Sequence, residues 1–103
     1  KFSIMISLNE KNRSNFLKNK VYVLKFSASW CGPCKLLAPI FSKVAESTDV
    51  PCASVDIDES STKDLVTRYQ VKSVPTLIKV KNGVEVDRRQ GFVNQTELTQ
   101  FIN

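Results

Sequence analysis

The chain has 103 residues, 42% of them hydrophobic, which is enough for one packed core and too few for two ordinary domains. Its net charge of +5 comes from lysines and arginines scattered among acidic residues, which argues against the continuous basic face of a nucleic-acid-binding protein. The absence of histidine excludes Ser-His-Asp and Cys-His nucleophilic pairs, and three cysteines are one ligand short of a closed zinc site.

No stretch of the sequence approaches the roughly 20 apolar residues that a membrane helix requires, and the first ten residues contain no signal-peptide cleavage site. We therefore expect a single domain, residues 1–103, that is cytoplasmic and contacts no membrane. The chain begins with Lys1 and not with methionine, which leaves open a targeting segment upstream of it.

The first half of the sequence predicts two strands, each followed by a helix. Residues 2–7 alternate like a strand, and residues 8–20 have a weak helical spacing. Residues 21–26, VYVLKF, are an almost continuous apolar run, as in a strand covered on both faces. Residues 33–47 have helical spacing, with Pro39 expected to kink the helix. The predicted buried stripe of this helix comprises Leu36, Leu37, Ile40, Phe41, Val44 and Ala45.

The second half predicts three further strands and two helices. Residues 50–58 are a strand candidate, and the helix after it opens with Ser61 and Asp64 spaced like a capping box. Residues 75–80 and 84–91 are strands joined by Asn82-Gly83, a strong hairpin signal. The last helix, within residues 94–103, opens with Asn94 and Glu97 spaced for capping, and its expected buried face comprises Leu98, Phe101 and Ile102.

Taken in order, these elements read βαβαβαββα. Helical crossovers place strands in parallel, whereas the closing hairpin is antiparallel, so the sequence predicts an α/β domain with a central mixed sheet and helices on both faces. In such sheets, ligands bind beyond the carboxyl ends of the strands. The WCGPC sequence at residues 30–34 follows the strand at residues 21–26. We therefore expect the functional site at this strand end.

Cys31 and Cys34 stand two residues apart at the predicted strand-to-helix junction. There, unpaired N–H groups and the positive end of the helix dipole favour a thiolate, which is the nucleophile in disulfide exchange. We expect Cys31 to attack a substrate disulfide and Cys34, one turn further on, to resolve the mixed disulfide. Gly32 allows a close approach, and Pro33 stiffens the loop. The pattern predicts a reversible two-electron switch.

Each of these features also has a structural interpretation. The cysteine pair could be a structural disulfide or half of a metal site, although so short a bridge in a cytosolic chain favours redox chemistry. Trp30 could be a core aromatic residue, but its place beside the nucleophile favours a partly exposed platform. Gly91 could mark only a strand end. For Cys52 we favour a buried core thiol over a regulatory one.

Several of these residues match the pattern of the thioredoxin family. The chain contains Trp-Cys-Gly-Pro-Cys-Lys at residues 30–35, a helix proline at Pro39, Val-Pro-Thr at residues 74–76 and a late glycine at Gly91. One Cys-x-x-Cys alone would be a weak signal, whereas these features together are specific. On these motifs the chain resembles the thioredoxin family from near Val21 to its end.

The resemblance implies a thioredoxin fold with a defined site. The Val74–Pro75 peptide bond would be cis and face the cysteines, and the Val74 backbone would pair with an extended substrate strand. The substrate-binding surface would be shallow and rather apolar, and would comprise Trp30, Gly32, Pro33, Val74, Pro75 and Gly91.

The resemblance also implies the activity, which is protein-disulfide reduction by dithiol-disulfide exchange, in electron transport and cell redox homeostasis. The substrates would be proteins with disulfides. Electrons would come from a thioredoxin-reductase-type donor, because the sequence has no flavin or nicotinamide fingerprint. We expect no cofactor, no metal, no nucleic-acid partner and a monomer.

Two positions depart from the family pattern. Lys25 stands where the family usually has a buried aspartate that takes the proton of the resolving thiol, and Ser54 is the expected counterpart of a nearby lysine. A neutral Lys25 amine could act as that base, whereas an ammonium would favour thiolates and make the protein more oxidising. Alternatively, Lys25 reaches water or pairs with Asp56, with little effect. We predict that Lys25 modulates the pKa of the thiols. Ser27 replaces a large aromatic residue, which predicts a looser or wetter loop.

Two other functions stay open at this point. A more oxidising protein of the same fold would act as an oxidant or isomerase. Lys25 favours this alternative, and Pro33 argues against it, because those relatives often carry histidine there. A thioredoxin-fold subunit with a structural binding role would not need the cysteines at all.

Overall fold

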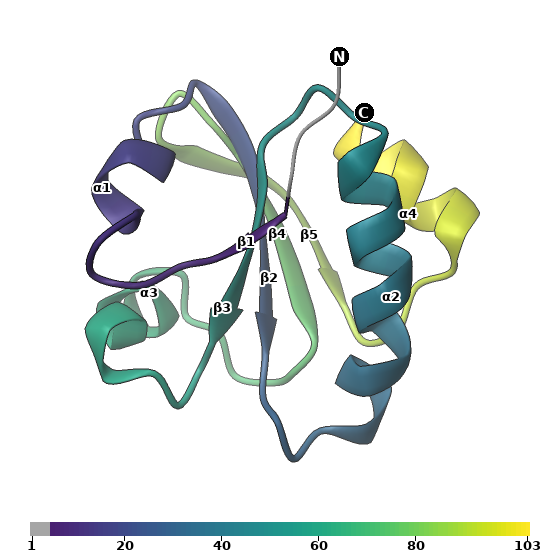
Figure 1. Ribbon diagram of the computed structural model, residues 1–103, viewed down its shortest axis with the longest axis horizontal. Coiled ribbons are helices and arrows are strands. Elements are labelled where there is room, and N and C mark those ends of the chain that lie inside the picture. Colours follow the sequence, from purple (N-terminus) through teal and green to yellow (C-terminus); the bar gives the residue numbers. More distant parts are fainter. Residues whose placement is uncertain (1–4) are drawn as a thin grey trace.

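The computed structural model describes residues 5–103 and has the element order that the sequence predicts, with one added 3-10 turn (Figure 1). Of the strand expected at residues 2–7, residues 2–4 lie outside the described part of the chain, and Ile6–Ser7 forms β1. The other elements are α1 (Arg13–Phe16), β2 (Val21–Ser27), α2 (Gly32–Glu46), β3 (Cys52–Asp56), the 3-10 turn η1 (Ser60–Thr62), α3 (Lys63–Arg68), β4 (Thr76–Lys81), β5 (Val84–Gln90) and α4 (Gln95–Ile102).

The five strands form one mixed sheet in the order β1-β3-β2-β4-β5. The central strand β2 lies parallel to β3 and antiparallel to β4, and β4 pairs antiparallel with β5. Within β2, Lys25 lies opposite Ser54 of β3 and Leu77 of β4. The predicted mixed sheet and the predicted pairing of Lys25 with Ser54 are both confirmed.

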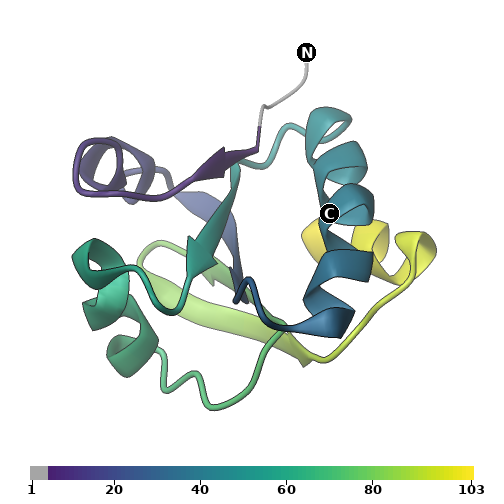
Figure 2. The ribbon, with the colours of Figure 1, turned by 60° about the horizontal axis from the view of Figure 1, so that its bottom comes forward.

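Helices cover both faces of the sheet, with α1 and α3 on one face and α2 and α4 on the other (Figure 2). The side chains of β2 alternate between two cores, so that Leu24 and Phe26 pack on the α1 and α3 side and Val23 on the α2 and α4 side. Lys25 has the same parity as Val23, and its Nζ lies 5.3 Å from the ring centre of Phe41 in α2. Burial on both faces explains the almost continuous apolar run of β2.

The longest helix, α2, buries one face against the sheet and is exposed on the other. Leu36 belongs to the exposed face, with 66% of its surface accessible, so its predicted burial is wrong. The helix continues through Pro39, which lies on the exposed side. Within residues 5–103 no helix, α2 included, has the length and apolar character to cross a membrane. The buried apolar residues of α2 are Leu37, Phe41, Val44 and Ala45.

The first helix is much shorter than the sequence predicts. Leu8 continues the pairing of β1 with β3 through its N–H, which donates to a β3 carbonyl over 2.9 Å. The side chain of Asn9 then accepts two backbone N–H groups of the next turn, at 2.8 and 3.0 Å. Such an Asx turn competes with helix formation, so only Arg13–Phe16 is helical. Leu8 and Phe16 are nevertheless both buried, as their spacing suggests.

The predicted capping box of the third helix is wrong, because both of its residues have other partners. The Ser61 hydroxyl donates to the carboxylate of Glu59 over 2.7 Å. Asp64 forms an ion pair with Arg13 of α1 at 2.6 Å, across 51 positions of sequence. The helix α3 itself begins without a side-chain cap. Local spacing cannot show a competing partner that is so distant in sequence.

The C-terminal elements match their sequence signals closely. Asn82 and Gly83 both have positive φ, at 53° and 80°, as a tight hairpin turn requires. Asn94 and Glu97 form a reciprocal capping box, in which each side chain accepts the other residue's backbone N–H, at 2.8 and 3.0 Å. The residues that α4 buries are Leu98, Phe101 and Ile102, as predicted.

Candidate active site

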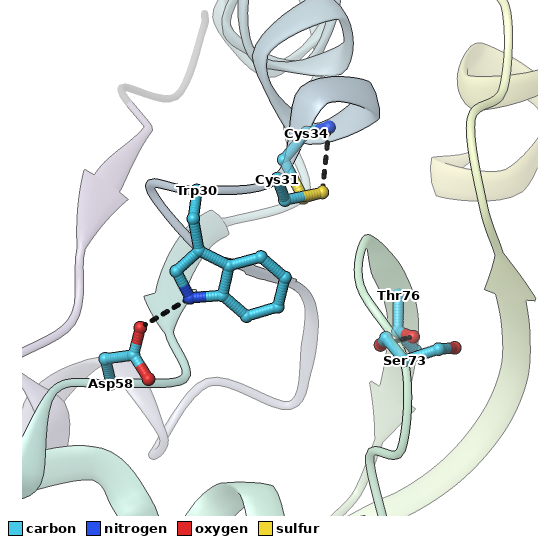
Figure 3. The surroundings of a disulfide bond; sticks show 6 residues. All are labelled: Trp30, Cys31, Cys34, Asp58, Ser73 and Thr76. Carbon is cyan, nitrogen blue, oxygen red and sulfur yellow. Dashed lines mark hydrogen bonds between the residues drawn. A yellow bond between two sulfur atoms is a disulfide. The ribbon is translucent and has the colours of Figure 1, made fainter.

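The two cysteines form a disulfide at the junction of β2 and α2 (Figure 3). β2 ends at Ser27, and Cys31 caps α2, with its Sγ accepting the N–H of Cys34 over 3.2 Å. The two Cα atoms are 5.2 Å apart. The pair therefore lies where the sequence predicts the site, beyond the carboxyl end of the central strand.

The two cysteines are almost equally buried but have different surroundings. Cys31 is 5% exposed and Cys34 is 4% exposed. The sulfur of Cys31 accepts a backbone N–H at the amino end of α2, an environment that stabilises negative charge. Cys34 lies further along the helix and lines an open cavity of about 270 Å³, whose wall also includes the exposed residues Lys35 and Asp56. These positions favour a thiolate at Cys31 and give Cys34 access to the cavity.

Trp30 is the exposed aromatic residue beside the disulfide, with 66% of its surface accessible. Its indole N–H donates to a carboxylate oxygen of Asp58 over 3.0 Å (Figure 3). Asp58 follows β3, and since β2 and β3 are parallel, their carboxyl ends meet at the same edge of the sheet. Trp30 is therefore exposed, as expected, and is not a core residue.

The loop before β4 forms the opposite wall of the site (Figure 3). Its Val74–Pro75 peptide bond is cis, as expected, and Val74 packs against Cys31 and Cys34. Gly91, at a φ of 85°, donates its N–H to the carbonyl of Pro75 over 2.8 Å, so the end of β5 supports the loop. No hydrogen bond from residues 5–103 reaches the Val74 backbone. Its N–H and C=O are therefore free to pair with an extended strand.

A groove of about 340 Å³ runs between Trp30 and this loop. Gly32 and Pro33 are exposed at the start of α2, whereas Pro75 is buried and Gly91 only partly exposed. The structure thus places Trp30 and Val74 in the groove, whereas the other four predicted docking residues are not part of its lining. The groove is lined by Trp30, Ile57, Val71, Lys72, Ser73 and Val74.

Lys25 is buried in the centre of the sheet, with 4% of its surface exposed. Burial lowers the pKa of its ammonium group, because the charged form loses hydration. Within residues 5–103 it forms no ion pair, so the pairing with Asp56 that the sequence left open is not found. Its ammonium lies instead over the ring of Phe41.

Lys25 and Cys34 line the same cavity, although they come from different elements. The cavity is polar, because four serines contribute to its wall and none of their hydroxyls is hydrogen-bonded to a residue of the described range. Ser27, which replaces a large aromatic residue of the family pattern, is one of these serines. The remaining lining residues are Ser7, Ala28, Ser29, Lys35, Ala38, Ser54 and Asp56.

The third cysteine, Cys52, lies apart from the site in the core between the sheet and the helices α2 and α4. It is 1% exposed, and its thiol donates to the carbonyl of Val50 over 3.3 Å. Burial raises the pKa of the Cys52 thiol to about 12. These surroundings agree with a core thiol. Residues 5–103 contain no group of three or more Cys, Asp or Glu side chains that could hold a metal.

Sequence reasoning missed five residues in or beside the groove. Asp58 and Ile57 directly follow β3, so their place at the carboxyl end of the strand beside β2 was a usable signal. Val71, Lys72 and Ser73 lie in an irregular loop, where no periodicity indicates which side chains face the groove. They could be found only from the folded structure.

The amino-acid sequence matches known proteins over almost its whole length. The family model described as Thioredoxin matches residues 4–103. A thioredoxin of Mycoplasmoides gallisepticum is 39% identical over 85 residues, which cover 82% of this chain and 83% of the relative. A thioredoxin of Chlamydia pneumoniae is 39% identical over 97 residues, which cover 93% of each chain.

The fold matches a solved structure equally well. The crystal structure of Schistosoma mansoni thioredoxin superimposes with a TM-score of 0.80. The two chains are 30% identical, and the match covers 98% of this chain and 93% of the other. Sequence and structure therefore agree on the same group of proteins.

Proposed function

The chain belongs to the thioredoxin family and is a disulfide oxidoreductase of the thioredoxin type, and from this premise we propose that Cys31 is its nucleophile and Cys34 its resolving residue. The observation that carries this assignment is the hydrogen bond from the N–H of Cys34 to the sulfur of Cys31 at the amino end of α2. A reduced Cys31 would keep this donor, which favours its thiolate at neutral pH.

The reaction moves two electrons from the cysteine pair to a protein disulfide. The Cys31 thiolate attacks one substrate sulfur, which forms a mixed disulfide and releases the first substrate thiolate. Cys34 then loses its proton and attacks the sulfur of Cys31, which closes the Cys31–Cys34 bond and releases the second substrate thiolate. Both substrate thiolates take up protons from solvent. The structure represents the oxidised product of this cycle.

We assign substrate docking to the groove between Trp30 and the Val74–Pro75 loop. An extended substrate segment could pair with the free N–H and C=O of Val74 and rest its apolar side chains against the exposed indole of Trp30. Gly32, Pro33 and Gly91 border this path and allow a close approach. Main-chain pairing reads little of the substrate sequence, so many protein disulfides should be accepted.

Regeneration of the dithiol requires an electron donor. We propose a reductase of the thioredoxin-reductase type, a monomeric state, and a cytoplasmic role in electron transport and redox homeostasis. A compartment in which thiols stay reduced suits a protein that must return to its dithiol form after each cycle.

Two variants test the assignment of the cysteines. Cys34→Ser should trap a mixed disulfide between Cys31 and a protein substrate, which is visible as a covalent adduct by mass spectrometry. Cys31→Ser should form no such adduct and should lose reduction of the substrate with dithiothreitol as electron source. An adduct on Cys34 in the Cys31→Ser protein, at the same rate, would contradict the assignment.

The alternative function, oxidation of substrate thiols, is favoured by one observation, the buried Lys25. If its side chain is charged, a cation near the cysteines would stabilise the thiolates of the reduced form. The equilibrium reduction potential of the Cys31–Cys34 pair, measured in glutathione redox buffer, distinguishes a disulfide reductase from a thiol oxidant. A potential near that of thioredoxins, about −270 mV, supports the reductase. A potential near −120 mV, which is the range of strong thiol oxidants, would support the oxidant.

A further inference from the structure

The fold brings Lys25 and Cys34 to one cavity, although β2 and α2 are separate elements. The cavity measures about 270 Å³, and both side chains form part of its wall. Lys25 is the one charged side chain that is buried within residues 5–103. A buried cationic group without an ionic partner is unfavourable for folding, so its position on the same cavity wall as a reactive cysteine indicates a role in the chemistry.

The charged groups around the Lys25 amine are few. From β3, Asp56 lines the cavity but is exposed and forms no ion pair with Lys25. From α2, Lys35 lines the cavity and is also exposed, and the neighbour from β4 is the apolar Leu77. Of the described residues in β1, Ser7 lines the cavity. The amine is therefore held in place by its position in the strand and not by a carboxylate.

We propose that the neutral amine of Lys25 accepts the proton of Cys34 when the mixed disulfide is resolved. This inference rests on the proposed role of Cys34 as the resolving residue. The thiolate is the nucleophile in disulfide exchange, so the proton must leave before Cys34 can attack. The cavity is polar and large enough for water, which can carry the proton between sulfur and nitrogen.

The environment of Lys25 suits an acceptor. Burial lowers the pKa of its ammonium, so at neutral pH more of the amine is free than in an exposed lysine. In the proposed step the S–H bond of Cys34 breaks and an N–H bond forms on Lys25. The thiolate then attacks the sulfur of Cys31. The disulfide bond between Cys31 and the substrate breaks, and its electron pair leaves with the substrate sulfur. Lys25 afterwards returns its proton to solvent.

An amine and a carboxylate differ in the charges that this transfer creates. A neutral thiol and a neutral amine become a thiolate and an ammonium, which attract each other across the cavity. With a carboxylate acceptor, the total charge stays negative and no such attraction arises. Lys25 should therefore both receive the proton and stabilise the Cys34 thiolate before it attacks.

The test measures resolution separately from the first attack. Reduced protein is mixed with excess substrate disulfide, and Trp30 fluorescence follows closure of the Cys31–Cys34 bond between pH 5.5 and 9.5. Three single variants are compared: Lys25→Met removes the amine, Lys25→Arg keeps a positive charge that cannot be neutralised, and Lys35→Met is the matched control on the same cavity. Each is also placed in a Cys34→Ser background, which reports only the attack of Cys31.

We expect Lys25→Met and Lys25→Arg each to slow resolution at pH 7 at least tenfold and to change the dependence of the rate on pH, while Lys35→Met keeps the wild-type profile. A wild-type rate in Lys25→Arg would show that charge alone acts, and a wild-type profile in Lys25→Met would remove any role. Either result overturns the proposal, as would an equal loss in Lys35→Met. Should a variant fail to fold, Lys25→Gln replaces it.

The background variants separate this proposal from the assignment of the cysteines. Adduct formation on Cys31 in the Cys34→Ser protein should proceed at the same rate with Lys25 and with Met at that position. If no adduct forms with either residue, the proposed function fails first. If adducts form normally and Lys25→Met also resolves the mixed disulfide at the wild-type rate, the roles of the cysteines stand. The proton acceptor is then another group.

Discussion

The carboxylate of Asp58 accepts the indole N–H of Trp30 over 3.0 Å, and so links the exposed ring beside the disulfide to the carboxyl end of β3. An aromatic side chain that is 66% exposed would otherwise sample several rotamers. The hydrogen bond selects one orientation, in which the ring lines the docking groove. Substrate proteins therefore meet a wall of the groove that is already in place.

The Asp58→Ala variant should reduce protein disulfides more slowly. Loss of one exposed, charge-assisted hydrogen bond corresponds to about 1 kcal/mol, or about a fivefold decrease in kcat/KM. Reduction of a small aliphatic disulfide, which does not use the groove, should change little. Glu59→Ala is the control, because Glu59 is also acidic and exposed but contacts Ser61. Equal losses in both variants would indicate a general effect of negative charge.

The Lys25→Met variant should be more stable than the wild type at low and neutral pH. The pKa of Lys25 is lower in the folded than in the unfolded state, so below the folded pKa both states are protonated and the full penalty for the buried charge applies. The penalty fades as the pH rises toward 10.5, the ordinary value. We expect a gain of about 1–3 kcal/mol at pH 6 that disappears above pH 10.5.

Urea unfolding at pH 6, 8 and 10 measures this gain for Lys25→Met. Lys63→Met serves as the control, because Lys63 is exposed on α3 and the same chemical change there removes no buried charge. A gain that does not vary with pH would mean that packing of the methionine, and not the removal of charge, stabilises the protein.

Gly91→Ala should lower the stability of the protein. Gly91 has a φ of 85°, and although a Cβ would meet no atom within 4 Å, an alanine in the left-handed region is unfavourable by about 1–2 kcal/mol. The melting temperature should fall by about 4–16 °C. Gly32→Ala provides the comparison, because Gly32 is helical and equally unobstructed. It should leave stability unchanged or raise it by up to about 1 kcal/mol.

Cys52 should resist alkylation in the folded, reduced protein. Burial raises the pKa of its thiol to about 12, so at pH 8 only about one molecule in ten thousand carries the thiolate, and the residue is 1% exposed. Iodoacetamide should modify Cys31 rapidly and Cys52 only after unfolding in urea, as peptide mass spectrometry can determine. Modification of Cys52 at the rate of Cys31 in the folded state would contradict its assignment to the core.

Local sequence signals were sufficient wherever neighbours along the chain determine the structure. The Asn82–Gly83 turn, the capping box of Asn94 and Glu97, and the apolar run of β2 all form as predicted. The position of the cysteine pair followed for the same reason, because a strand end and a helix start are both local features. Backbone geometry and hydrogen bonding within a few residues decide each of these.

Other features depended on partners that are distant in sequence. Asp64 pairs with Arg13 instead of capping α3, and Asp58 holds Trp30 from a neighbouring strand. The predicted burial of Leu36 failed because the helix presents only one side to the sheet. In each case packing or a competing hydrogen bond, formed only when the chain folds, overrode the local preference.

Motifs and periodicity along the chain were enough to identify the family, the mixed sheet and the cysteine pair, because these features are encoded locally. The sequence also showed that Lys25 departs from the family pattern, but not what surrounds the amine. The folded structure was needed to show that Lys25 is buried, has no ionic partner within residues 5–103 and lines one cavity with Cys34. The physical reason is that hydration, and with it the pKa of an amine, depends on every element that packs around the group, and no single segment of the chain contains that information.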